Sequence, residues 1–141
     1  MRPFLSTHTK HKSAVVPFSL RQRHLTIRTL GKYFGVFMNF AIIGCGRIAA
    51  NHVNAAIRSG MNVVALCDLS QRAMDAIRYE FKLDQTKTYT DFKQMLKENR
   101  IDVVSLAVDS GIRAKIALSV LDFGVHLIVE KPMAMSLPDA D

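Results

Sequence analysis

The chain has 141 residues, a length that favours a single domain able to bury a substantial core. Hydrophobic residues form 49% and charged residues 22% of it, proportions typical of globular proteins. No apolar run approaches the roughly 18 residues that a membrane span needs, which argues against a transmembrane class. The formal net charge of +7 points at first to nucleic acid or an anionic membrane as a partner.

The positive charge is concentrated in residues 1–37. Seven of the 19 Lys and Arg residues and none of the 12 acidic residues lie there, so the 12 basic and 12 acidic residues of 38–141 cancel. Two interpretations of this leader stay open: a transit-like peptide, or a start codon assigned too early, with Met38 as the natural initiator. We favour the second, and neither gives the leader a folded role. Nucleic acid and membranes are therefore not expected as partners.

From Met38 onward, short apolar runs alternate with segments of helical period. Strands are predicted over 39–43, 62–67, 88–89, 102–108 and 126–129, and helices over 47–59, 71–82, 91–99, 111–123 and after Ser136. The helical period places inward Ile48, Val53, Ala56 and Ile57 of the first helix and Ala73, Ala76, Ile77 and Phe81 of the second. Apolar strands alternating with helices predict a parallel sheet covered on both faces. Right-handed crossovers then give the strand order 3-2-1-4-5, a doubly wound α/β Rossmann fold.

The first predicted strand runs into Gly44-Cys45-Gly46-Arg47-Ile48-Ala49, a G-x-G-x-x-A loop that opens a helix. Alone this pattern is weak, but a strand before it, a helix after it and an acid about 20 residues on form the context of dinucleotide binding. Gly44 permits the tight turn, Gly46 lets a pyrophosphate approach the backbone, and Ala49 lets the helix pack on the sheet. The free N–H groups of the helix start then face the phosphates.

The acid in this pattern is Asp68, at the end of the second predicted strand. A carboxylate there accepts hydrogen bonds from both ribose hydroxyls and repels a 2′-phosphate, which favours NAD over NADP. Arg72 leaves NADP open, because its guanidinium can accommodate that phosphate. Methyltransferases that bind S-adenosylmethionine also combine a glycine-rich loop with such an acid, and they are the main alternative at this point.

The two cysteines carry no sign of a disulfide or a metal site. Cys45 and Cys67 each lie at the end of a predicted buried strand, where cysteine acts as a small hydrophobic residue. The sequence has no C-x-x-C pair and no Cys/His cluster at zinc spacing. We therefore expect no metal ligands.

The fifth predicted strand ends in Glu130-Lys131-Pro132, at the edge where ligands bind in open α/β sheets. A lysine there can lie near the nicotinamide and polarise a substrate hydroxyl or stabilise a developing alkoxide. The proline fixes the backbone after it. From position alone, however, an ordinary surface lysine is the better interpretation of Lys131.

Residues 40–49, 63–68 and 124–134 together resemble the glucose–fructose oxidoreductase/inositol dehydrogenase/MocA family, and the likeness extends over 39–141. Its most specific element is Glu130-Lys131-Pro132. The resemblance implies an NAD(P)-dependent oxidoreductase that acts on a sugar, inositol, sugar nucleotide or related polyol. It also implies a catalytic role for Lys131 and a cis peptide before Pro132. The cofactor-binding residues expected from loop, acid and family are Gly44, Cys45, Gly46, Arg47, Ile48, Asp68, Arg72, Ser110, Glu130 and Lys131.

Two departures from the family pattern bear on function. Arg113 stands where the family commonly has His, which puts the contacts after the fourth strand in doubt, and His52 and His126 are interpreted as structural. The family's second domain, which supplies the substrate pocket, is not in this sequence. We therefore expect a truncated cofactor domain, cytoplasmic and inactive by itself, whose full-length form would assemble as a homo-oligomer. The alternative is a non-catalytic protein that senses the dinucleotide.

Overall fold

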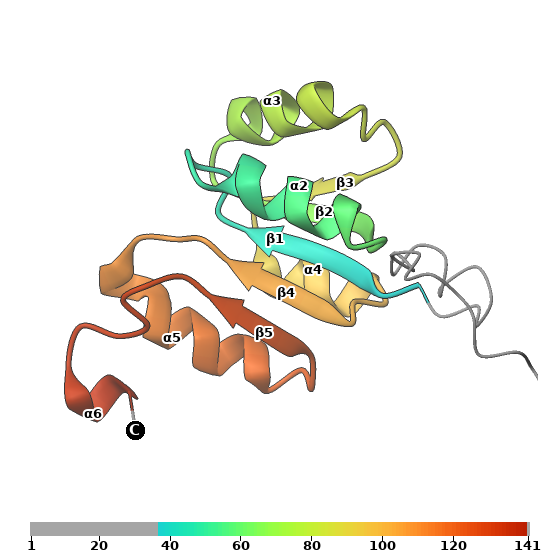
Figure 1. The fold of residues 1–141 in the computed structure, drawn as a ribbon. Coiled ribbons are helices and arrows are strands. Elements are labelled where there is room, and N and C mark those ends of the chain that lie inside the picture. The colour runs from blue at the N-terminus through green and yellow to red at the C-terminus, as the bar shows by residue number, and fades with distance from the viewer. Residues whose placement is uncertain (1–36, 141) are drawn as a thin grey trace, which may run out of the picture.

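The fold is known from a computed structural model that describes residues 37–140. Its five strands are β1 (Asn39–Ile43), β2 (Asn62–Cys67), β3 (Lys87–Tyr89), β4 (Val103–Leu106) and β5 (His126–Val129). They pair in parallel in the order β3-β2-β1-β4-β5, which confirms the predicted topology (Figure 1). The leader predicted at 1–37 lies outside the described residues except for Phe37.

Helices cover both faces of the sheet. They are α2 (Ala49–Arg58), α3 (Gln71–Phe81), α4 (Phe92–Glu98), α5 (Ser110–Leu121) and the short α6 (Leu137–Ala140). Figure 1 shows α2 and α3 on one face and α4 and α5 on the other. Within residues 37–140, no helix is long and apolar enough to cross a membrane.

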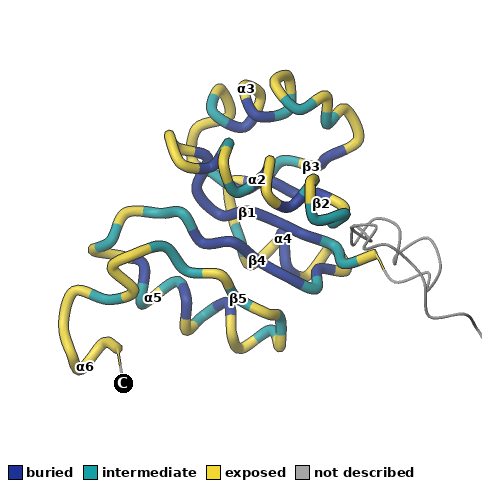
Figure 2. Tube along the Cα trace, viewed as in Figure 1, coloured by how far each residue is buried: buried dark blue, intermediate teal, exposed yellow. Residues whose placement is uncertain are grey.

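The side chains of β1 divide the core into two layers, because successive residues of a strand point to opposite faces. Phe40 and Ile42 pack with α2 and α3, whereas Ala41 and Ile43 pack with α4 and α5. All four are at most 4% exposed. Figure 2 shows this buried centre, flanked by an edge strand, β5, on which exposed residues alternate.

Two predicted core positions are wrong. Ile48 is 40% exposed because it precedes α2, whose first residue is Ala49 and not residue 47. Ala76 is exposed on α3, and Met74, at 0% exposure, takes the inward place. The helix is rotated so that its long apolar side chain fills the core, while a methyl group faces solvent at little cost. Smaller end errors occur at β4, predicted to run over 102–108, and α5, predicted over 111–123.

Candidate functional site

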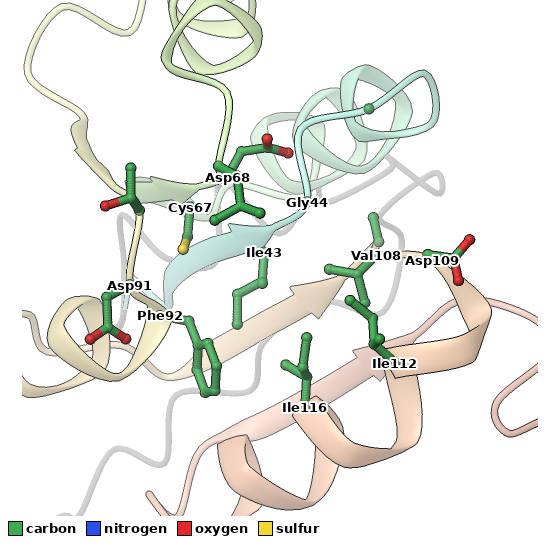
Figure 3. A pocket seen from close by; sticks show the side chains of 14 residues that line it. Ile43, Gly44, Cys67, Asp68, Asp91, Phe92, Val108, Asp109, Ile112 and Ile116 are labelled. Atoms are coloured by element: carbon green, nitrogen blue, oxygen red, sulfur yellow. The ribbon is translucent and has the colours of Figure 1, made fainter.

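A cleft of about 570 Å³ lies beyond the carboxyl ends of β1, β2 and β4. This is where the strand order reverses direction between β1 and β4, the position at which open α/β sheets bind ligands. Figure 3 shows Phe92, Ile112 and Ile116 on one side of the cleft and Asp68 on the other. Its lining residues are Ile43, Gly44, Gly46, Cys67, Asp68, Leu69, Thr90, Asp91, Phe92, Ala107, Val108, Asp109, Ile112 and Ile116.

The two loop glycines have different physical roles. Gly44 has φ +94°, and a Cβ there would lie 2.6 Å from the carbonyl oxygen of Ala107, so the fold itself requires glycine. Gly46 has no positive φ, and a Cβ there would meet no atom within 4 Å. The space beside Gly46 is therefore open and leaves room for a ligand to approach the backbone.

Next to Gly46, the start of α2 presents unused hydrogen-bond donors. The amides of Gly46, Arg47 and Ile48 have no partner among residues 37–140, and all three residues are exposed. No side chain caps the helix, and no acidic residue lies in its first turn. Free amides and the positive end of the helix dipole together favour an anion. This part of the site therefore fits a pyrophosphate.

Asp68 joins the two loops that border the cleft. Its Oδ2 accepts a hydrogen bond from the amide of Cys45 at 2.6 Å, and its Oδ1 accepts one from the amide of Ser70 at 2.7 Å. Each carboxylate oxygen can accept more than one hydrogen bond, so Asp68 keeps acceptor capacity for a ribose hydroxyl. The sequence analysis predicted a contact of Asp68 with the ligand but not its hydrogen bond to the amide of Cys45.

The cysteines are free and buried, as predicted. Burial, followed by the negative charge of Asp68, raises the pKa of Cys45 and of Cys67 to about 12. The two thiols are packed on opposite faces of the sheet, because Cys45 belongs to the layer of α2 and Cys67 to that of α4. Among residues 37–140, no group of three or more His, Cys, Asp or Glu is placed to hold a metal ion.

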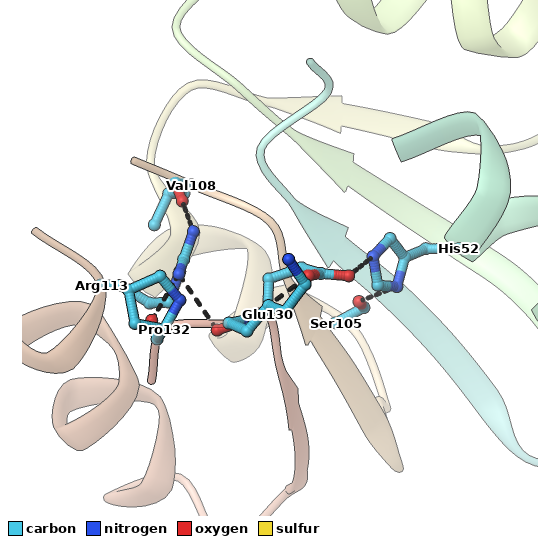
Figure 4. Close-up of polar contacts among 7 residues, drawn as sticks. His52, Ser105, Val108, Arg113, Glu130 and Pro132 are labelled. Carbon is cyan, nitrogen blue, oxygen red and sulfur yellow. Dashed lines mark hydrogen bonds and ion pairs between the residues drawn. The ribbon is translucent and has the colours of Figure 1, made fainter. Parts of the chain in front are cut away.

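The segment that follows β5 is held by side chains from other elements (Figure 4). The carboxylate of Glu130 lies 2.9 Å from Nε2 of His52, and Nδ1 of His52 lies 2.9 Å from the hydroxyl of Ser105. Because a carboxylate only accepts, Nε2 carries the shared proton. This hydrogen bond is the main reason that the pKa of Glu130 is lowered. The Lys131–Pro132 peptide is cis, as the family resemblance implied.

Arg113 approaches the same segment from α5. Its guanidinium donates to the carbonyl oxygens of Glu130, at 3.0 Å, and of Pro132, and also to that of Val108, at 2.6 Å. The residue is only 7% exposed. The family position that commonly holds His is thus occupied here by a cation that contacts three backbone carbonyls.

The geometry brings only part of the predicted site to the cleft. Gly44, Gly46 and Asp68 line it, and Cys45 contacts Asp68 through its amide. Arg47 and Ile48 lie beside the cleft at the start of α2, Arg72 is exposed on α3, and Ser110 begins α5. Glu130 and Lys131 follow β5 and do not line the cleft. The ligand contacts assigned to these residues stay predictions.

Comparison with known proteins decides the family. The Gfo/Idh/MocA family, described as "Oxidoreductase family, NAD-binding Rossmann fold", matches residues 38–141. The chain belongs to this family. The matched part comprises every element described above, so the chain carries the family's NAD-binding Rossmann domain.

Among curated Gfo/Idh/MocA relatives, the D-apiose dehydrogenase of Paraburkholderia graminis is 32% identical over 101 residues, which is 71% of this chain and 26% of that protein. Glycosyl hydrolase family 109 protein 1 of Akkermansia muciniphila is 30% identical over 109 residues, 70% of this chain and 22% of that protein. The WlbA dehydrogenase of Bordetella pertussis, solved with NADH and UDP-GlcNAcA, is 30% identical with a TM-score of 0.67, over 74% of this chain and 31% of that one. The chain thus spans between about a fifth and a third of these relatives' length.

Sequence reasoning missed most of the residues that line the cleft apart from the glycine loop and Asp68. Thr90, Asp91 and Phe92 follow β3, whereas Val108, Asp109 and Ile112 lie between β4 and the first turn of α5. Their position at or shortly after the ends of predicted strands was the available signal, since those ends meet at one edge of a parallel sheet. The contacts of His52 and Arg113 had no such signal.

Proposed function

We propose that this chain binds NAD(H) in the cleft, with the pyrophosphate on the free amides of Gly46, Arg47 and Ile48. The apolar wall of Phe92, Ile112 and Ile116 would hold the adenine, and Asp68 would accept from the adenosine ribose. The observation that carries the proposal is Gly46, because its open side serves no purpose in the fold. Asp68 favours NAD over NADP by repelling a 2′-phosphate.

The activity proposed for the protein as a whole is oxidation or reduction of a sugar, sugar nucleotide or related polyol. NAD, when bound, supplies the hydride acceptor at its nicotinamide ring. Lys131 would assist at the substrate oxygen, by polarising a hydroxyl or stabilising a developing alkoxide. The names of the D-apiose dehydrogenase and of the dehydrogenase bound to UDP-GlcNAcA support this substrate class. The 141 residues alone are expected to bind the cofactor with little or no turnover.

The test compares Gly46→Ala with Gly44→Ala by calorimetric titration of NADH and by thermal unfolding. Gly46→Ala should leave the melting temperature unchanged and raise the dissociation constant of NADH by about tenfold, equivalent to ~1.4 kcal/mol. Gly44→Ala should lower stability by roughly 1–3 kcal/mol, because it combines a positive φ with a backbone clash. Undiminished NADH binding by Gly46→Ala would contradict the proposed site.

A second candidate activity is glycoside hydrolysis, which the name of the Akkermansia relative favours. A non-catalytic dinucleotide sensor is the third, and it needs no role for Lys131. An assay of a longer form of the protein distinguishes the dehydrogenase from the hydrolase. A dehydrogenase accumulates NADH with its product, whereas a hydrolase releases a sugar without net change of the cofactor. Loss of turnover in Lys131→Met, with NADH binding kept, would exclude the sensor.

A further inference from the structure

The guanidinium of Arg113 is the most unusual charge in the described structure. It is 7% exposed, and no carboxylate of residues 37–140 lies within ion-pair distance of it. Its Nε has no hydrogen-bond partner among those residues. Arg113 also lies in the first turns of α5, the positive end of a helix dipole. Burial, missing counter-charge and dipole all disfavour a cation here.

In this position, Arg113 donates hydrogen bonds to three backbone carbonyls (Figure 4). One belongs to Val108, which lines the cofactor cleft. The other two belong to Glu130 and Pro132, the residues immediately before and after Lys131. One side chain therefore connects the wall of the cleft to both neighbours of the lysine that the family resemblance implicates in catalysis. Locally unfavourable residues of this kind are expected where function requires them.

The carboxylate of Glu130 is held separately, from the other side. Its partners are His52 of α2 and the amide of Lys131. Arg113 thus contacts the backbone on both sides of Lys131, while His52 contacts the side chain of Glu130, the residue before it. Lys131 itself is exposed, and the residues on both sides of it are held by these contacts.

We propose that Arg113 is a positioning residue that sets where Lys131 stands relative to the nicotinamide end of the bound cofactor. This inference rests on the proposed NAD(H) site. The planar guanidinium suits the task because it directs several N–H groups to separate acceptors, whereas a lysine ammonium is a single donor centre and a histidine ring has at most two. Arg113→His should therefore retain part of the positioning of Lys131, and Arg113→Gln should retain less of it.

The experiment uses two ligands, NADH and ADP-ribose, with the full chain. ADP-ribose lacks the nicotinamide, so its binding reports the loop and the adenosine half alone. Arg113→Gln should change the dissociation constant of ADP-ribose by less than about twofold and raise that of NADH by about fivefold, within the range of measured couplings between neighbouring residues. The fluorescence of bound NADH should change as well, because it reports the surroundings of the nicotinamide ring.

A double-mutant cycle with Lys131→Met connects the effect to Lys131. In the Lys131→Met background, Arg113→Gln should no longer alter the ratio of the NADH and ADP-ribose dissociation constants. Thermal unfolding verifies that each variant is folded, and Arg113→Lys replaces Arg113→Gln if the latter is not.

Two results would overturn the inference: an unchanged ratio of the NADH and ADP-ribose dissociation constants in Arg113→Gln, or a changed ratio that persists without Lys131. Equal weakening would indicate a role in the fold alone. If the unmodified chain binds neither ligand, the proposed function fails, and the inference that rests on it fails too. Binding of both ligands with no selective effect of Arg113 overturns the inference alone.

Discussion

At the scale of single residues, Glu130 shows how a side chain next to the site is fixed by chemistry from elsewhere in the fold. Its carboxylate contacts His52 and the amide of Lys131, and its carbonyl contacts Arg113. Ser105, which is fully buried, completes the chain of hydrogen bonds through His52. Each of these bonds to the Glu130 carboxylate favours its ionised form, which is why its pKa lies below the ordinary 4.5.

Replacement of Glu130 by Gln should therefore have a pH-dependent effect on stability. A lowered pKa in the folded state contributes stability that is present above about pH 4.5 and is lost as the pH falls through the lowered value. The unmodified chain should melt at a higher temperature than Glu130→Gln near pH 6, and the two should converge as the pH is lowered below about 4. Thermal unfolding followed by circular dichroism across this range measures the difference.

Glu80→Gln is the matched control, because Glu80 is exposed on α3 and its side chain makes no hydrogen bond or ion pair within residues 37–140. Its effect should be small at every pH. A difference between the unmodified chain and Glu130→Gln that stays constant down to pH 3 would contradict the link to ionisation.

At the scale of elements, α3 shows which buried positions helical periodicity predicts correctly and which it does not. The predicted inward face of α3 contained Ile77, which is buried, but also Ala76, which is exposed. Met74 is fully buried instead. Alanine suits either side of a helix, so its presence in the sequence says little about rotation. The phase of α3 is decided by Met74 and Ile77, whose burial removes the most apolar surface from water.

Met74→Ala should lower the free energy of unfolding by about 2–4 kcal/mol, because it leaves a cavity in the layer between α3 and the sheet. Ala76→Gln, two residues along the same helix, should change it by less than about 0.5 kcal/mol. Urea unfolding of both variants measures the two values. Similar losses for the two would mean that α3 is rotated relative to the structure described here.

At the scale of the whole molecule, the excess positive charge and the proposed cofactor cleft lie in different parts of the chain. The excess positive charge lies in residues 1–37, whereas the described residues that line the cleft all lie within 43–116. In the proposed site, α2 contributes its dipole and its free amides to the phosphates.

Removal of residues 1–37, so that the chain begins at Met38, should leave the dissociation constant of NADH within about twofold, because residues 38–141 are formally neutral and include every described residue that lines the cleft. The same deletion should abolish retention on a cation-exchange column. Calorimetry and chromatography of the two proteins test this. A tenfold weaker complex after deletion would assign the leader a part in binding.

The sequence by itself determined the strand order and the family, and it placed the glycine loop and Asp68 at the ends of neighbouring strands, because these depend on periodicity and on short spacings within one strand–loop–helix unit. Gly44 and Gly46 look alike in the sequence, and only the structure separated the glycine that the fold needs from the one that leaves a ligand room. The contacts of Arg113 and His52 with the residues next to Lys131 were also decided only by the tertiary structure. Arg113 is 17 residues from Glu130 and His52 is 78 residues from it, and no local pattern specifies contacts over such separations. They form because a parallel sheet brings the ends of β4, β5 and the helix that follows β1 to one edge.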